Sequence, residues 1–579
     1  MQKSSALRSQ FPAPISTALG CLLVGALLSP ALAAGDEAGA SHRAFEHLKK
    51  ERAAIAAAYS DELFKLAEQC VEFGGGKIGP EILERIVALH TPPRSRRKTA
   101  QDSGVMAGAE KEAAGAGGSE PEGEGEDDTL SAGLPRAAQQ PSEAEQELAE
   151  LRTRTEAIKA RYQGAGSGFD ERALKRLEDQ RERATAKFVE QSKQLALKAV
   201  KKGYPAHAYE LLLWTLQFDP ENKNLRKQLL RQRPFKQKDG TTRWYSEFEL
   251  EKASKGFTLH PEYGWVRPDD LTALKAGKLN FNGQWLPKEK VEELRRDWAN
   301  HWVYETEHFQ VHTNAPLADA VEFGREVEKL YAFFFRVFVD YYAVKGAPDP
   351  SLVFGGGKDL GSRKLWLNYY RSRESYLEAC RTDPQLASDP LLAQSAGFYD
   401  PNTGKAYFYR EEQGPDLTTI YHEVTHQIFG ETGPRGPKPP TWMVEGLAVF
   451  MEDPVVRGEE GSERLLAGTE PPPGISTSKA PKNLPEWLKA CGDRDTFHGA
   501  ARRENYALGG TVVHFFLLYQ GGRYRSGFVR YMQEAYKNAE PELPTRLSQL
   551  WDYCQVTPEK LQEDWLAFNK DPFTHLFDF

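Results

Sequence analysis

Cysteine is scarce in this chain, and its spacing excludes one kind of metal site. Only five of the 579 residues are cysteines, and no two have the Cys-x-x-Cys spacing of finger-type zinc sites. Besides Cys21 and Cys70, these are Cys380, Cys491 and Cys554, which all lie beyond residue 300. At most one disulfide can therefore form within that last region, and buried free thiols explain the same pattern equally well.

Neither sign of charge dominates. The chain has 75 Lys and Arg against 83 Asp and Glu, a net charge of −8, which is mild for this length. Nucleic-acid binding would require clustered basic stripes interleaved with aromatics, so we predict no nucleic-acid partner. The run Gly355-Gly356-Gly357-Lys358 lacks the Gly-x-x-x-x-Gly-Lys-Ser/Thr spacing, which excludes a phosphate loop of that type.

Long apolar runs are also missing, except near the N-terminus. An apolar segment over 15–28 follows two basic residues and precedes Ala31-Leu32-Ala33, a small-x-small cleavage pattern. This order predicts a signal peptide over 1–33, because the run is too short to cross a bilayer comfortably as an anchor. We therefore expect an exported protein, periplasmic or extracellular, with no stable membrane span after signal cleavage.

Composition divides the rest of the chain into regions. Apolar residues recur at spacings of three and four over 41–90 and over 143–233, which predicts helices. Between them, 94–142 is rich in Gly, Ala, Ser and Glu, and we expect a disordered acidic linker. Part of 143–233 resembles half of a tetratricopeptide unit, although an ordinary helical hairpin explains the same pattern.

A short internal repeat follows over 236–296. Trp244, Trp265 and Trp285 are spaced by 21 and 20 residues, and each begins a similar phrase. We expect each phrase to form a short strand or turn followed by a helical turn, with the Trp in the core of a small module. A docking surface for a protein partner, on these modules or on the helical region, is the alternative interpretation.

The region 300–579 combines predicted strands with predicted helices. Alternation predicts strands over 302–313 and 365–370, and a hairpin over 397–409. An amphipathic helix is expected over 316–342. The predicted fold class is therefore α+β, with this region preceded by an α-helical N-terminal region and small Trp-containing modules.

The chemistry-bearing motif is His-Glu-Val-Thr-His at 422–426. Histidines at i and i+4 share one face of a helix, so both His422 and His426 can reach one metal ion. Glu423, between them, occupies the position of a general base for a metal-activated water. A third protein ligand with an open fourth position would make such a site catalytic rather than structural.

The third ligand is narrowed by exclusion. A metzincin would have Gly three residues and His six residues after the second histidine, where this chain has Phe429 and Thr432. A carboxylate is therefore expected. Glu431 falls in a predicted loop, whereas Glu445 and Glu452 share one face of a predicted helix over 441–452. We choose Glu445, nineteen residues after the second histidine.

The motif with Glu445 resembles the gluzincin pattern of thermolysin-like and aminopeptidase-N-like zinc metallopeptidases. Pro-Pro-Thr-Trp-Met-Val-Glu-Gly-Leu-Ala-Val-Phe-Met-Glu, residues 439–452, is also similar to the peptidase-MA-like domain found in a family of exported bacterial proteins. The resemblance implies a C-terminal zincin (thermolysin-like) catalytic domain over 300–579. It implies one zinc ion per chain, a peptide or protein substrate, and a substrate-binding edge strand at 404–409.

The same resemblance bears on the donors around the metal. A tyrosine often opens the helix after the ligand helix in peptidase-MA-like sequences, which implies that Tyr506 stabilises the developing oxyanion; His498 is the second candidate. Thermolysin-like enzymes place an Asp four residues after the third ligand to orient a histidine. That position here is Val449, so the group that orients the histidine must differ.

Three functions remain open at this point. The first is an exported zinc-dependent peptidase with Glu423 as general base. The second is a catalytically inactive zincin-fold binding or scaffold protein, in which the helical and Trp modules carry the function. The third is a hydrolase of cell-wall peptides. Substrate, cleavage preference and oligomeric state are not encoded in any motif of the sequence.

Overall fold

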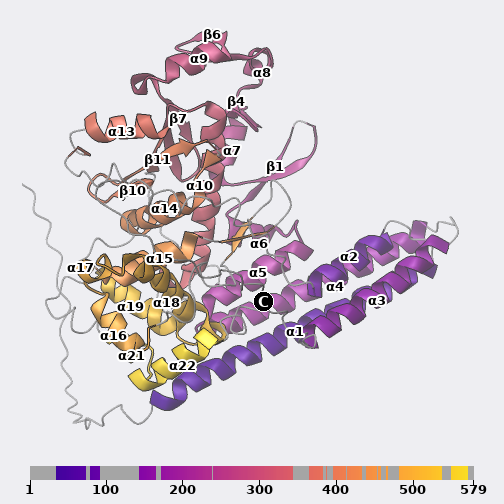
Figure 1. Ribbon diagram of the computed structural model, residues 1–579. Coiled ribbons are helices and arrows are strands. Elements are labelled where there is room, and N and C mark those ends of the chain that lie inside the picture. The colour runs from indigo at the N-terminus through magenta and orange to yellow at the C-terminus, as the bar shows by residue number, and fades with distance from the viewer. Residues whose placement is uncertain are drawn as a thin grey trace, which may run out of the picture.

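The computed structural model places helices and strands of mixed α and β type (Figure 1). It describes the following residues: 34–72, 78–90, 143–164, 171–237, 239–342, 364–382, 386–387, 395–412, 414–432, 439–452, 454–457, 464–466, 481–537 and 549–570. The predicted signal peptide over 1–33 and the predicted linker over 94–142 lie outside these residues. No helix of the described segments is long and apolar enough to cross a membrane.

Helices occupy both segments in which apolar periodicity predicts them. They are α1 Ala34–Glu72, α2 Ile78–His90, α3 Glu143–Gly164, α4 Glu171–Lys201, α5 Pro205–Phe218 and α6 Lys223–Leu230. Figure 1 shows α1 to α4 running side by side as an elongated arm. The arm has its own apolar core, in which Tyr59 of α1 stacks on Phe188 of α4 with ring centroids 4.4 Å apart. The same Tyr59 hydroxyl hydrogen bonds to Thr185 at 2.9 Å.

The tryptophan repeat forms three β-hairpins, each followed by a short helix. The elements are β1 Arg233–Lys236, β2 Thr242–Tyr245, α7 Glu247–Ser254, β3 Thr258–His260, β4 Gly264–Val266, η2 Pro268–Asp270, α8 Leu271–Lys275, β5 Lys278–Phe281, β6 Gln284–Pro287 and α9 Lys288–Arg295. Each repeat Trp lies in the second strand of its hairpin and is half-buried. Ser246 and Glu249 form a capping box at the start of α7, which explains why the helix begins directly after the strand.

The main sheet has the strand order β10-β11-β9-β8-β7. Its strands are β7 Trp302–Glu305, β8 Phe309–Thr313, β9 Leu365–Tyr370, β10 Gly397–Asp400 and β11 Lys405–Glu411, and β12 Gly414–Pro415 pairs with the end of β11. β8, β9 and β11 are parallel, whereas β7 and β10 run antiparallel at the two edges. The single strand predicted over 302–313 is thus a hairpin, because the chain turns at Thr306, whose hydroxyl accepts a hydrogen bond from the amide of Phe309.

The sheet corrects the position of the expected edge strand. The strand β11, which contains most of the predicted edge 404–409, is hydrogen-bonded to β10 on one side and to β9 on the other. Its backbone groups are therefore already paired, and it cannot accept an extended peptide. Among the described strands, the edge on this side of the sheet is the antiparallel strand β10, the first strand of the same predicted hairpin.

Helices cover both faces of this sheet. α10 Leu317–Val337, α11 Val339–Tyr342 and α14 Leu417–Thr432 share one core with the face that carries Leu367 and Tyr369. The single helix predicted over 316–342 is two helices, α10 and α11, which are separated at Phe338. The opposite face packs with α13 Arg373–Thr382 around Tyr370 and Tyr376.

The remaining helices follow α14 in the chain. They are α15 Thr441–Glu452, α16 Leu484–Ala490, α17 Arg494–Phe497, α18 Arg502–Gly522, α19 Arg525–Lys537, α21 Leu550–Tyr553 and α22 Pro558–Lys570, with the hairpin β13 Val455–Arg457 and β14 Arg464–Leu466. α15 crosses α18 where two glycines meet, and a Cβ on Gly446 would lie 2.6 Å from the carbonyl oxygen of Gly509. Cys70, Cys380, Cys491 and Cys554 are all buried free thiols.

Candidate metal centre

The motif helix α14 is fixed at its start and along its length. Asp416 accepts hydrogen bonds from the amide and hydroxyl of Thr419, as a residue that caps a helix N-terminus does. Ile420 and Val424 are buried in the core under the sheet. Gln427 donates to the backbone carbonyl of Trp366 in β9 at 2.9 Å, which ties the helix to the sheet. Helical periodicity then turns the two motif histidines away from the sheet, towards α15.

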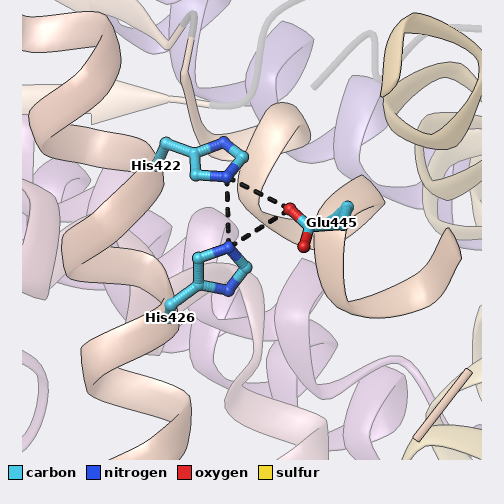
Figure 2. Close-up of side chains that lie close together, drawn as sticks. All are labelled: His422, His426 and Glu445. Atoms are coloured by element: carbon cyan, nitrogen blue, oxygen red, sulfur yellow. Dashed lines mark hydrogen bonds and ion pairs between the residues drawn. The ribbon is translucent and has the colours of Figure 1, made fainter. Parts of the chain in front are cut away.

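The three expected ligands converge on one point (Figure 2). The Nε2 atoms of His422 and His426 are 3.1 Å apart. The Oε2 atom of Glu445 is 3.3 Å from the first nitrogen and 3.4 Å from the second. The side chains of His422, His426 and Glu445 are 13%, 16% and 16% exposed, so the centre is shielded from bulk water. The structure thus brings all three sequence-predicted ligands together.

The chemistry of this donor set fits a cation. The Nδ1 atom of His422 faces the carboxylate of Glu452 at 2.6 Å, so in the neutral ring this nitrogen carries the proton. Its Nε2 lone pair then points at a second imidazole nitrogen and at a carboxylate oxygen. Two nitrogens and an oxygen are ligands that zinc prefers, and a cation at their meeting point would satisfy all three. Within the described chain, this trio is the group with metal-binding geometry.

The carboxylates explain the protonation behaviour of the centre. Burial lowers the pKa of His422, but its hydrogen bonds to Glu445 and Glu452 outweigh burial and raise that pKa well above its ordinary value. Burial raises the pKa of Glu445, yet its hydrogen bonds to the two histidines hold that pKa far below its ordinary range. Glu445 is therefore an anion at neutral pH, as a metal ligand must be.

The structure identifies the group that orients His422, which the sequence left without a name. Glu452 lies two turns after Glu445 on α15 and accepts the Nδ1 proton of His422. A carboxylate in this position fixes the tautomer and the ring orientation of a metal-bound histidine. From the sequence alone, Glu452 was only an alternative to Glu445 as the third ligand. Glu431, the other alternative, lies in the last turn of α14 and interacts with the hydroxyl of Tyr399 at 3.0 Å instead.

The side chain of Glu423 extends from α14 to the edge strand β10. Its Oε2 atom accepts a hydrogen bond of 2.9 Å from the backbone amide of Tyr399 in β10. Burial raises the pKa of Glu423, while the charges of His422 and His426 and the amide of Tyr399 oppose that effect. The base candidate therefore contacts the backbone of the edge strand β10.

Tyr506 and His498, the two predicted oxyanion donors, both lie near the centre. The ring of Tyr506 is 6.1 Å from that of His422, and the ring of His498 is 5.8 Å from that of Tyr506. Burial, with the charge of Glu445, raises the pKa of Tyr506, so its hydroxyl keeps its proton and can donate. A further tyrosine, Tyr536 of α19, is close enough to Glu445 for the carboxylate to raise its pKa in addition to burial. No sequence signal pointed to Tyr536.

Comparisons with protein-family models, curated proteins and solved structures found no match for this chain.

Proposed function

We propose that the protein is an exported zinc-dependent peptidase of the gluzincin, peptidase-MA-like type. The observation that carries the proposal is the convergence of His422, His426 and Glu445 within hydrogen-bonding distances, with Glu423 directly beside them. One zinc ion per chain would be held by these three side chains. When bound, it would supply Lewis-acid activation of a water molecule and of the substrate carbonyl.

The roles of the protein groups follow from their positions. Glu423 accepts the proton of the attacking water and transfers it to the leaving amine. Its raised pKa suits this task, because a base works best when its pKa approaches the working pH. Tyr506 donates its hydroxyl proton to the oxygen that becomes negative, with His498 next to it as the second donor.

The substrate edge is β10 rather than 404–409. The amide of Tyr399 points away from β11 and towards α14, since it donates to Glu423. A peptide that lies antiparallel to β10 would pair with the backbone groups on its outer side and pass over the ligand helix. The backbone groups of β10 would then position the scissile bond next to Glu423.

The first experiment measures metal content. Mature protein, residues 34–579, is analysed for metals beside a His422→Ala/His426→Ala double variant. We expect about one zinc per chain in the former and none in the latter. Absence of zinc from both proteins after metal supplementation would contradict the proposal.

The second experiment separates catalysis from binding. Glu423→Gln keeps the shape of the side chain and all three ligands but removes the base. We expect zinc content to be unchanged and peptide hydrolysis to fall by a factor of about 100 or more. If the variant cleaves a peptide library as fast as the unchanged protein, Glu423 is not the base. Wall-derived peptides in the same library separate a cell-wall hydrolase from a general peptidase.

A further inference from the structure

Two arginines, Arg494 and Arg502, lie on the elements that carry His498 and Tyr506. Arg494 of α17 and Arg502 of α18 are exposed, and among the described residues neither guanidinium forms an ion pair. The carboxylates of Glu445 and Glu452 contact the ligand histidines. The two guanidinium groups therefore have the opposite charge to these neighbouring carboxylates.

The position of Arg502 follows from α18. It lies four residues before Tyr506, so the two side chains share one face of the helix. The guanidinium carbon of Arg502 is 5.6 Å from the ring centroid of Tyr506, which is 6.1 Å from the ring of His422. The guanidinium thus lies within about 12 Å of the ligand ring. Each extended residue spans roughly 3.3–3.6 Å, so a side chain or chain end one or two residues from the scissile bond can reach it.

Arg494 lies one turn before His498, whose backbone amide donates to the carbonyl oxygen of Arg494 at 2.9 Å. Burial lowers the pKa of His498; Glu445 opposes that effect, and the positive charges of Arg502 and Arg494 add to it. Both guanidinium groups therefore act on His498, whose ring is 5.8 Å from that of Tyr506. The nearby acidic neighbour is Asp495, whose charge acts on His498 in the opposite sense.

We propose that Arg502 and Arg494 make this centre select peptides that carry a carboxylate within two residues of the scissile bond. The carboxylate is either an acidic side chain or the C-terminus of the substrate. Guanidinium groups bind carboxylates through paired, charge-assisted hydrogen bonds, and Tyr506 holds Arg502 at the edge of the site. This inference rests on the proposed peptidase function, and it names the substrate class.

The test uses zinc-loaded full-length protein and matched peptide pairs. One pair differs only in Glu against Gln near the scissile bond, and the other only in a free against an amidated C-terminus. We expect kcat/KM to be about tenfold or more higher for the carboxylate member of one pair, and the pair that responds identifies the source of the carboxylate. In Arg502→Ala and in Arg494→Ala this ratio falls towards one.

The ratio of kcat/KM between the two peptides of a pair cancels any effect that a variant has on both peptides. Arg502→Ala also takes a neighbour from Tyr506, but that change affects both members of a pair equally. Arg503→Ala is the matched control, because the next residue on a helix is rotated by about 100° and its loss leaves the ratio unchanged. Equal cleavage of both members by the unchanged protein overturns the inference while the peptidase function stands.

Peptide binding to the Glu423→Gln variant tests the proposal without any cleavage. Calorimetric titration with the same peptides is expected to show tighter binding of the carboxylate member, and the preference is lost in the Glu423→Gln/Arg502→Ala double variant. If no peptide is cleaved but this preference is present, the peptidase proposal fails and the carboxylate site stands. Equal binding of both members overturns the carboxylate site.

Discussion

His422 contacts a carboxylate at each of its ring nitrogens. Glu452 lies at Nδ1 and Glu445 lies beside Nε2, and the two glutamates come from one helix. A metal at the ligand point would replace the interaction at Nε2 and leave the one at Nδ1 in place. The hydrogen bond to Glu452 therefore holds the ring in its ligating orientation before a metal arrives.

Replacing Glu452 by Gln should weaken metal binding. The variant keeps the shape of the side chain but removes the charge that orients His422, and we expect zinc affinity to fall by a factor of about 10–100. Competition with a chromophoric chelator measures the affinity. Glu431→Gln removes the same charge from α14 without touching a ligand, and it should change the affinity by less than about twofold. Equal losses in the two variants would show a general effect of charge.

His514 should make stability depend on pH. Burial lowers the pKa of His514 in α18 to about 4, and among the described residues its Nε2 atom has no hydrogen-bond partner. In the unfolded chain the imidazole takes up a proton below about pH 6.5, whereas in the folded protein it stays neutral down to about pH 4. Stability is therefore present above pH 6.5 and is lost as the pH falls towards 4.

The size of this effect follows from proton linkage. Between pH 7 and pH 5 it amounts to about 2 kcal/mol of the free energy of unfolding. Urea unfolding at the two pH values measures it, and His514→Leu should reduce the difference between them by about that amount. An unchanged pH dependence in the variant would assign the acid sensitivity to other groups.

The contact between α15 and α18 sets the position of Glu445. Gly446 directly follows the ligand and rests against the backbone of Gly509, so the two helices approach more closely than side chains would allow. The phrase Glu-Gly-Leu-Ala thus combines one ligand with the residue that permits its placement. This close approach gives a packing reason for the glycine.

Gly446→Ala should move the helices apart. The new Cβ would lie 2.6 Å from the carbonyl oxygen of Gly509, and rigid backbone must shift to receive it. We expect a loss of about 1–3 kcal/mol in stability and weaker zinc binding, since Glu445 moves with α15. Thermal unfolding and zinc titration measure the two effects. Gly492→Ala, whose Cβ would have no neighbour closer than 3.4 Å, should show neither.

The sequence predicted those helices and strands whose own residues show helical spacing or strand alternation. Helical spacing located His422 and His426, and the helix expected over 441–452 has the bounds of α15. The edge strand was assigned wrongly because both strands of a hairpin have the same alternation, and only the pairing of β11 with β9 distinguishes them. The role of Glu452 was missed for a similar reason, since two carboxylates on one helical face are both possible ligands until a histidine is placed between them.

The helical arm is attached to the helix that lines the metal centre. Phe45 of α1 packs against Gly521, where α18 departs from helical geometry with a φ of +69°. The buried ring of His207 of α5 lies 4.8 Å from that of Phe45. An ion pair of 3.0 Å between Glu210 and Arg336 links α5 to α10. The N-terminal helices are therefore part of the structure that supports α18.

Phe45→Ala should loosen α18 from a distance. Phe45 is 3% exposed, and truncation of such a ring costs about 3–5 kcal/mol. We expect faster amide hydrogen exchange in α18 together with a lower Tm. Phe64→Ala removes an equally buried ring of α1 that lies within the arm core, and its effect on exchange should remain in the arm. If Phe45→Ala and Phe64→Ala give the same pattern of amide exchange, the arm is not coupled to α18.

Because Glu445 and Glu452 both lie on α15, a change of register within these twelve residues affects the ligand and the group that orients His422 together. A single insertion or deletion between the two glutamates would rotate one of them by about 100° and separate ligand from orienting group. Because Gly446 and Gly509 are in close backbone contact, neither position can take a larger side chain unless the two helices move apart. An insertion in this short helix would therefore disturb the ligand, the group that orients His422 and the crossing with α18 together.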